Sequence, residues 1–289
     1  METRCLRLTQ RLLPVSAFLI AVSVPLLTAA LANPKIINAA PHETEDGPPL
    51  AKRSQFQPGE TVFFSFQLSG YGESPLKQVR LTYRIDAVDP AGVHIMEPVE
   101  SIFDATLHDE DKHWLPKLRA PIAIPPFAPS GVYKITTTVT DDISHLSTSA
   151  ETTFEVAGHN VAPALQLAIR NLTFHRTDED SHPLAVPAYR AGDTVFARFD
   201  IAGFRYDAEN AIDVFYDVAV LNSAGKQIYE QAHAAEDRSS SFYPKPYVGG
   251  QMSLALQKNM RPGQYTVVLT AHDEAGHQRA EVRHPFTVE

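Results

Sequence analysis

The fold is decided by two stretches of sequence, Gly131-Val-Tyr-Lys-Ile-Thr-Thr-Thr-Val-Thr-Asp141 and Gly263-Gln-Tyr-Thr-Val-Val-Leu-Thr-Ala-His-Asp273. Each is followed by an acidic turn and by a second alternating stretch, which ends at Val156 in one case and at Val288 in the other. Alternation of apolar and polar residues is typical of half-buried strands, so each stretch predicts a β-hairpin. The two hairpins begin 132 positions apart (263 − 131). This spacing predicts one β-domain that occurs twice in the chain.

The duplication extends towards the N-terminus of each half. Gly59-Glu-Thr-Val-Phe63 matches Gly192-Asp-Thr-Val-Phe196 at an offset of 133 (192 − 59), and further matches at that offset include Asn38 and His42 with Asn171 and His175. Repeats of this length are whole domains rather than solenoid units. Helical periodicity is nearly absent, and turn signals recur every ~8–12 residues. We therefore predict an all-β fold of two tandem antiparallel Ig-like β-sandwiches, at residues 33–157 and 164–289.

Residues 1–32 have the pattern of a secretory signal peptide. A basic start precedes an apolar run, Leu12–Ala32, which ends in the small-x-small sequence Ala30-Leu31-Ala32. We predict cleavage after residue 32 and a secreted, periplasmic or extracellular protein. The alternative is an uncleaved membrane anchor, which we rank lower because Pro14 and Pro25 interrupt the run. No later stretch is apolar for long enough to span a bilayer.

Composition excludes several classes of site. The only cysteine is Cys5, which lies within the predicted signal peptide. The mature chain would then have no disulfide, thiolate metal site or cysteine nucleophile, and its apolar cores would have to stabilise it. The formal net charge of −9 disfavours nucleic acids and anionic membrane surfaces as partners.

Two short motifs resemble known families. The hairpin that ends in Asp273-Glu-Ala-Gly-His277 resembles the last hairpin of bacterial Ig-like and fibronectin-III-like surface domains, with His277 where asparagine is usual. Pro58-Gly-Glu-Thr-Val62 is similar to the entry of macroglobulin-type sandwich domains. The resemblance implies an adhesion, stalk or accessory-binding role and no catalytic residues. The first copy has Asp142-Ile-Ser-His145 without the glycine, so its turn is expected to differ.

The most distinctive loop is His108-Asp-Glu-Asp-Lys-His-Trp114, which contains the only tryptophan. One interpretation is a ligand-facing loop in which Trp114 stacks on a sugar ring or a partner side chain; the other is that Trp114 covers an open edge of its own core. The matched region of the second copy, Ser239–Tyr247, is also aromatic. The binding candidates are Trp114, His108, His113, Tyr243 and Tyr247. Zinc binding by His108 and His113 is weakly indicated, because their spacing fits no regular face.

Acidic and histidine clusters recur in both copies. Asp141-Asp142 and Asp273-Glu274 could bind calcium between domains, but Asp at a turn commonly accepts hydrogen bonds from its own backbone, and we predict that role. His42 and His175 begin polar stretches that we interpret as a shared turn, with a duplicated metal site as the alternative. We predict no metal and no cofactor.

No motif for catalysis is present. The sequence lacks a Gly-x-Ser-x-Gly elbow, a His-Glu-x-x-His pair and a phosphate-binding loop. We therefore predict a non-enzymatic binding or structural module that interacts with a protein at the cell envelope, without catalytic residues. The alternative is a carbohydrate-binding accessory protein that uses Trp114, Tyr243 and Tyr247. An enzyme with a cleft between the domains, lined by His and Asp, ranks third.

Overall fold

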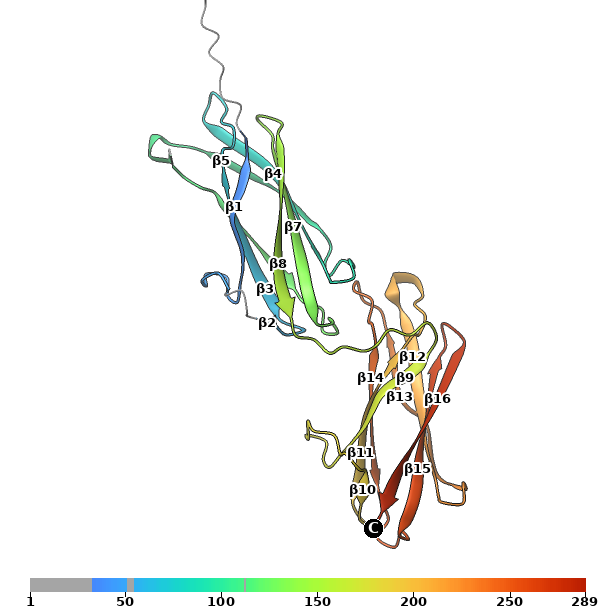
Figure 1. Ribbon diagram of the computed structural model, residues 1–289. Coiled ribbons are helices and arrows are strands. Elements are labelled where there is room, and N and C mark those ends of the chain that lie inside the picture. The colour runs from blue at the N-terminus through green and yellow to red at the C-terminus, as the bar shows by residue number, and fades with distance from the viewer. Residues whose placement is uncertain (1–32, 51–54, 112) are drawn as a thin grey trace, which may run out of the picture. The chain divides into compact units, whose positions relative to one another are not determined.

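The computed structural model describes residues 33–50, 55–111 and 113–289, and in these residues the fold is all-β (Figure 1). The predicted signal peptide lies outside the described residues. In the first half the strands are β1 (Lys35–His42), β2 (Gln55–Phe56), β3 (Thr61–Ser69), β4 (Gln78–Val88), β5 (Val99–Thr106), β6 (Lys117–Ala123), β7 (Gly131–Asp141) and β8 (Ser147–Val156). In the second half they are β9 (Ala168–His175), β10 (Ala188–Tyr189), β11 (Thr194–Ala202), β12 (Ile212–Leu221), β13 (Gln227–Ser239), β14 (Val248–Ala255), β15 (Gly263–Asp273) and β16 (Gln278–Val288).

Each half forms a sandwich of two sheets with the same strand order. The first sandwich has the sheets β1-β3-β6 and β2-β8-β7-β4-β5, and the second has β14-β11-β9 and β10-β16-β15-β12-β13. The all-β prediction and the two sandwich-like units are thus confirmed, and the repeat in sequence is a repeat in topology. Pairing is antiparallel except at two short contacts, β2 with β8 and β10 with β16, which are parallel.

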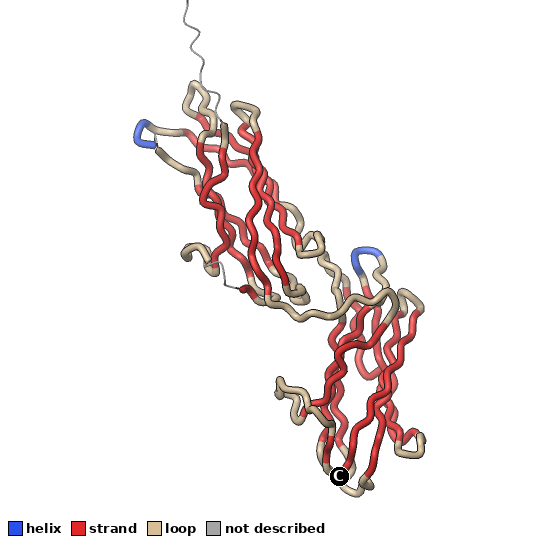
Figure 2. The backbone as a smooth tube through the Cα atoms, in the orientation of Figure 1, coloured by secondary structure: helices blue, strands red, loops and turns tan. Residues whose placement is uncertain are grey.

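The helical elements of the described residues are two short 3₁₀ turns in loops, η1 (Asp109–Asp111) and η2 (Ala208–Asn210), and loops join the strands at the ends of each sandwich (Figure 2). No helix among the described residues is long and apolar enough to cross a membrane.

The alternating stretches of the sequence build the cores. In β7 the side chains of Tyr133, Ile135 and Val139 are fully buried and Thr137 is 1% exposed, while Lys134, Thr136 and Thr138 between them are exposed or half-buried. In β15 the residues Val267 and Leu269 are equally buried. The period of two places every second side chain on one face, which is why the hairpins could be predicted.

A tyrosine at the start of each of these strands ties the strand to the preceding turn. The Tyr133 hydroxyl donates to the Pro129 carbonyl oxygen at 2.9 Å, and the Tyr265 hydroxyl donates to the Arg261 carbonyl oxygen at 2.8 Å. Burial, with a smaller contribution from the charge of Asp89, raises the pKa of Tyr133 far above its usual value. The Tyr133 hydroxyl therefore stays a neutral donor over the whole pH range in which the protein would be studied.

Replacing Tyr133 with phenylalanine is expected to lower the free energy of unfolding by about 1 kcal/mol, because the Pro129 carbonyl loses its donor while the ring packing remains. Urea denaturation checks this value. Tyr265→Phe should lower the stability of the second sandwich by a similar amount, and no change in either variant would contradict the structural role.

Residues 98–121 and 231–250, in which the sequence shows no clear alternation, contain regular strands. β5 occupies Val99–Thr106, and β13 continues from Gln227 to Ser239. Both lie at the end of their five-stranded sheets, and most of their side chains are exposed. An edge strand needs backbone pairing on one side only and no apolar face, so alternation does not reveal it.

Candidate functional site

The loop that follows β5 is anchored at both ends. Leu107 is buried, and its backbone N–H donates to the Lys77 carbonyl oxygen at 2.8 Å. At the other end the Pro116 carbonyl oxygen accepts from the Leu68 N–H at 3.1 Å. Within the loop the Asp111 carboxylate accepts from the His108 N–H at 2.7 Å. The loop is therefore fixed at both of its ends to the first sandwich.

Trp114 is both packed and exposed. Its ring lies against Phe103 of β5, with ring centroids 5.7 Å apart, and its backbone oxygen accepts from the Tyr71 hydroxyl at 2.8 Å. Phe103 in turn packs against the core. Trp114 nevertheless leaves 39% of its surface exposed. The ring therefore packs at the edge of the core through Phe103 and keeps part of its surface exposed, and a role of Trp114 in binding a partner stays a prediction.

The two histidines of the loop are exposed and belong to no metal-binding group in the part of the chain that the structure describes. His108 and His113 both face solvent. Among the described residues no group of three or more His, Cys, Asp or Glu side chains is placed to hold a metal ion. Their part in binding stays a prediction, and the structure brings them near Trp114 only through the shared loop.

Next to Trp114, β5 forms the terminal strand of its sheet. It pairs with β4 without interruption from Gln78↔Thr106 to Ile85↔Val99. Its outward side chains include Ile102, which is 53% exposed. A regular edge strand presents free backbone N–H and C=O groups to which another strand can add. The corresponding strand β13 has two register shifts and a positive φ at His233, which make it a poorer template.

The candidate aromatics of the second sandwich are less open. Tyr243 is 8% exposed, so its ring offers no face to a ligand in this structure. Tyr247 is half-buried, and its ring meets the ring of His159 edge-on at 5.1 Å. Of the three aromatics predicted to stack on a sugar, Trp114 has the most accessible ring.

The acidic turns of the two hairpins are built around buried carboxylates. Asp141 has no exposed surface and accepts from the backbone N–H groups of Gly72 at 2.6 Å and of Ile143 at 2.9 Å, and from the Ser144 hydroxyl at 2.8 Å. Asp273 is 1% exposed and accepts from the N–H groups of Arg205 and Gly276 at 2.9 and 3.0 Å. These carboxylates serve the turn, as predicted from the residue type.

The two turns share a positive φ at the matched histidine, although the first turn was expected to differ because it lacks the glycine. His145 and His277 both have positive φ, at 59° and 50°. Histidine, like asparagine, is one of the residues that tolerate this conformation. Gly276 does not adopt it; a Cβ there would lie 2.2 Å from Asp273 Oδ2, whereas Ser144 at the matched position donates to Asp141.

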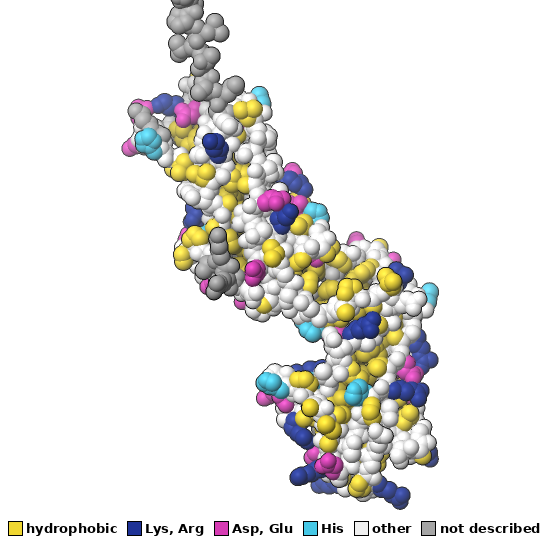
Figure 3. All heavy atoms as spheres, in the orientation of Figure 1, with side chains coloured by type: hydrophobic (Ala, Val, Ile, Leu, Met, Phe, Trp, Pro, Cys, Tyr) yellow, Lys and Arg dark blue, Asp and Glu magenta, His cyan; other side chains and the backbone are white. Residues whose placement is uncertain are grey.

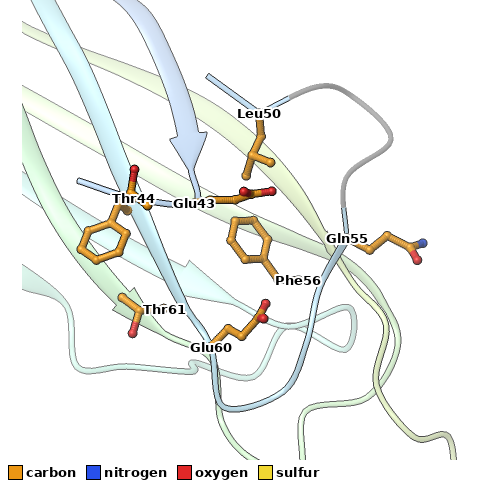
Figure 4. Close-up of a pocket in the computed structure, with 8 residues that line it drawn as sticks. Glu43, Thr44, Leu50, Gln55, Phe56, Glu60 and Thr61 are labelled. Carbon is orange, nitrogen blue, oxygen red and sulfur yellow. The ribbon is translucent and has the colours of Figure 1, made fainter. Parts of the chain in front are cut away.

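A pocket of about 700 Å³ lies at the other end of the first sandwich (Figure 4). Leu50 and the Glu43 carboxylate point towards the ring of Phe56, while Gln55 points away from it. Leu50 and Gln55 flank residues 51–54, which the structure does not describe, so we assign no function to this pocket.

Charged side chains do not gather in one patch of a single sign on the face shown in Figure 3. On β4 and β5 acids are paired with bases across the strands: Arg84 contacts Glu100 at 2.6 Å and Arg80 contacts Asp104 at 3.5 Å. The edge of β5 therefore presents locally balanced charge rather than the net negative charge of the chain.

Sequence reasoning missed Ile102 and the edge strand that carries it. The signal was weak, because Val99, Ile102 and Phe103 do not alternate. Phe103 faces the core and Ile102 faces solvent, as neighbours on a strand must. Only the pairing of β5 with β4 makes this assignment possible.

Comparisons with known proteins identify no family for this chain. No family model matches the chain, and no curated protein matches it. Among solved structures, one that is similar is described as the C-terminal domain of the Streptococcus pyogenes antigen I/II-family protein AspA. The similarity has a TM-score of 0.30 and 11% sequence identity, and covers 90% of this chain and 99% of that one. At these values it carries no inference about function.

Proposed function

We propose that this protein is a non-enzymatic module of two Ig-like sandwiches that binds a protein partner at the cell envelope. The observation that supports the proposal is the regular edge strand β5 with Trp114 beside it. An extended segment of the partner would add to β5 by backbone hydrogen bonds. Trp114 and Ile102 would contact its apolar side chains and so select the partner.

Several features favour a protein partner over a glycan at this surface. Tyr243 is buried, so the three-aromatic platform of the carbohydrate alternative lacks one member. The exposed Ile102 offers an apolar contact rather than a hydrogen bond. Export to the envelope is part of the proposal and rests on the sequence of residues 1–32.

The test is a pull-down from an envelope extract of the producing cells, with the mature protein as bait. Trp114→Ala should reduce recovery of the partner about tenfold or more, because a large aromatic anchor is lost. Ile102→Lys should act in the same direction, since an outward lysine on an edge strand opposes strand addition. The matched control is Ile228→Lys on β13, the edge strand of the second sandwich, where the side chain is 48% exposed.

The expected pattern is loss of the partner with Trp114→Ala and Ile102→Lys and retention with Ile228→Lys. An unchanged set of partners in the first two variants would show that β5 and Trp114 do not bind the partner. Retention of the protein on immobilised polysaccharides, with loss in Trp114→Ala, would instead support the carbohydrate alternative.

A further inference from the structure

The second sandwich has an open cleft on the outer face of its three-stranded sheet, lined by β9, β11 and β14 together with residues of the 176–187 loop and the linker. We call it the β9–β11 cleft. Its volume is about 660 Å³, which lies in the range of small-molecule sites. Two polar residues among its lining are buried: His175 is 4% exposed and Asp200 is 6% exposed. Thr173, Gln251 and Gly249 also line it.

The duplication provides an internal comparison for His175. In the first sandwich the matched residue is His42, which is 3% exposed. Both of its ring nitrogens are partnered: Nδ1 lies 2.8 Å from the Gly47 carbonyl oxygen and Nε2 lies 2.8 Å from the Ser65 hydroxyl. In that copy the histidine therefore connects the loop that follows β1 with strand β3. Both ring nitrogens are used in these two hydrogen bonds.

His175 is in a different state. Its Nε2 lies 3.0 Å from the Thr173 hydroxyl, but its Nδ1 is buried and has no partner among the described residues. Buried polar atoms of side chains are nearly always hydrogen-bonded, and an exception calls for an explanation. His175 lines the cleft, but its Nδ1 atom has almost no accessible surface, so a ligand would pair with it only after the imidazole turns towards the cleft.

Arg198 takes over the contact with the loop that His42 makes in the first copy, so His175 Nδ1 has no such partner. Arg198 stands at the position of Ser65, and its guanidinium donates to the carbonyl oxygens of Asp180, at 3.2 Å, and of Asp178. Asp180 is the residue that matches Gly47 in the first copy. In the second copy the arginine, and not the histidine, therefore fixes the loop after β9. The imidazole of His175 is available for a contact with a ligand.

Asp200 stands at the position that Gln67 occupies in the first copy, and its hydrogen bonds differ from those of Gln67. In the first copy the Asn38 amide donates to the Gln67 side-chain oxygen at 2.6 Å. In the second copy the Asn171 amide donates to Asp200 Oδ2 at 2.7 Å, and His159 Nε2 lies 2.9 Å from the same oxygen. Both contacts fall on Oδ2. Asp200 thus keeps acceptor capacity on Oδ1, at a position where the first copy has a neutral amide.

We propose that the β9–β11 cleft binds a neutral, hydroxyl-rich small molecule of the size of a mono- or disaccharide. The ligand's hydroxyl groups would pair with Asp200 Oδ1, which accepts, and with the Gln251 side-chain amide, which can donate and accept. They would also pair with His175 Nδ1 once the imidazole turns towards the cleft. An anion would meet the carboxylate of Asp200, and a cation would meet Arg198, whose guanidinium is already engaged with the loop. The cleft is separate from the β5 edge, so this site does not depend on the proposed function.

Gly249 provides a way to close the cleft without disturbing the sheet. It lies on β14 opposite Asp200, and a Cβ built on it would meet no atom within 4 Å. Gly249→Trp would therefore place an indole in the open space. The neighbouring Gly250 is unsuitable, because a Cβ there would lie 2.2 Å from the Phe199 ring. Gln264→Trp on β15, in the other sheet of the same sandwich, is the control for an added exposed indole.

The experiment is an NMR titration of the mature protein with neutral sugars: glucose, galactose, N-acetylglucosamine, maltose and cellobiose, each to about 50 mM. We expect at least one sugar to shift the backbone amides of Thr173, Gly249 and Gln251 in a saturable way. The shifts should disappear in Gly249→Trp and persist in Gln264→Trp. Inorganic phosphate and acetate at the same concentration should leave these amides unshifted.

His175→Leu separates binding from folding. It removes the unpartnered nitrogen, so the thermal midpoint should stay the same or rise while the affinity for the sugar falls about tenfold. His42→Leu, in contrast, should lower the midpoint of the first sandwich, because Ser65 and Gly47 lose their partner. The proposal is overturned if no sugar shifts the three amides, if the shifts survive Gly249→Trp, or if phosphate or acetate shifts them more than the sugars do.

Discussion

Replacing Asp141 with alanine is expected to lower the free energy of unfolding of the first sandwich by about 3 kcal/mol. The carboxylate has no exposed surface and joins two loops, since it accepts from Gly72 in the loop after β3 and from Ile143 and Ser144 in the turn after β7. Alanine would leave these buried donors without an acceptor. Urea denaturation followed by tryptophan fluorescence reports on this sandwich alone, because Trp114 is the only tryptophan of the chain.

The neighbouring residue provides the control. Asp142 is half-buried, and its carboxylate accepts from the Thr82 hydroxyl at 2.9 Å and lies 3.7 Å from Arg80. Asp142→Ala should cost about 1 kcal/mol or less, as is usual for partly exposed pairs. Equal effects of Asp141→Ala and Asp142→Ala would contradict the role assigned to the buried carboxylate.

The dependence of stability on acidic pH should also report on the Asp141 carboxylate. Burial alone would raise the pKa of Asp141, but the hydrogen bonds from Gly72, Ile143 and Ser144 outweigh it, so the pKa in the folded protein lies below the ordinary value of 3.8. A lowered folded-state pKa means that the stabilisation is fully present above the unfolded-state pKa and is lost as the pH falls through the folded-state value. Wild type should therefore lose more stability than Asp141→Ala below about pH 4. Parallel pH profiles would contradict this assignment.

The hairpins and the duplication could be predicted from sequence because both depend on local patterns. The alternation of β7 places Tyr133 and Ile135 on one face whatever the rest of the chain does. The repeated Asp141 and Asp273 could likewise be assigned to turns, because an aspartate at such a position finds donors in its own backbone. Interactions between residues that are close in the sequence can therefore be predicted without the structure.

The candidate sites could be predicted only in part, because they depend on which strands become neighbours. Trp114 was recognisable as a single unusual residue, but its contact with Phe103 requires the β4–β5 pairing. The β9–β11 cleft was not foreseen. The difference between Ser65 and Arg198 at matched positions was visible in the sequence, yet its meaning depends on Arg198 reaching the carbonyl of Asp180 across the loop. Divergence between the copies is informative once the structure shows which groups it leaves unpartnered.

Gly203→Ala is expected to lower the free energy of unfolding of the second sandwich by about 3 kcal/mol. Gly203 has a φ of 79°, which costs an alanine about 1 kcal/mol. In addition, a Cβ there would lie 2.2 Å from the backbone oxygen of Gln166. A backbone atom cannot rotate away as a side chain can, so the segment before β9 would have to move. This is the physical reason why glycine recurs at Gly70, where a Cβ would lie 2.5 Å from the backbone oxygen of Asn33.

Gly225→Ala separates the two contributions. Gly225 has a similar φ of 75°, but a Cβ there would meet nothing within 4 Å. Its substitution should therefore cost only the conformational term, about 1 kcal/mol. Urea unfolding followed by far-ultraviolet circular dichroism measures both variants, while the fluorescence of Trp114 in the first sandwich should follow the wild-type transition. If Gly225→Ala destabilised the protein as much as Gly203→Ala, backbone strain alone would explain both losses of stability. The close approach of Gly203 to Gln166 would then contribute nothing to the effect.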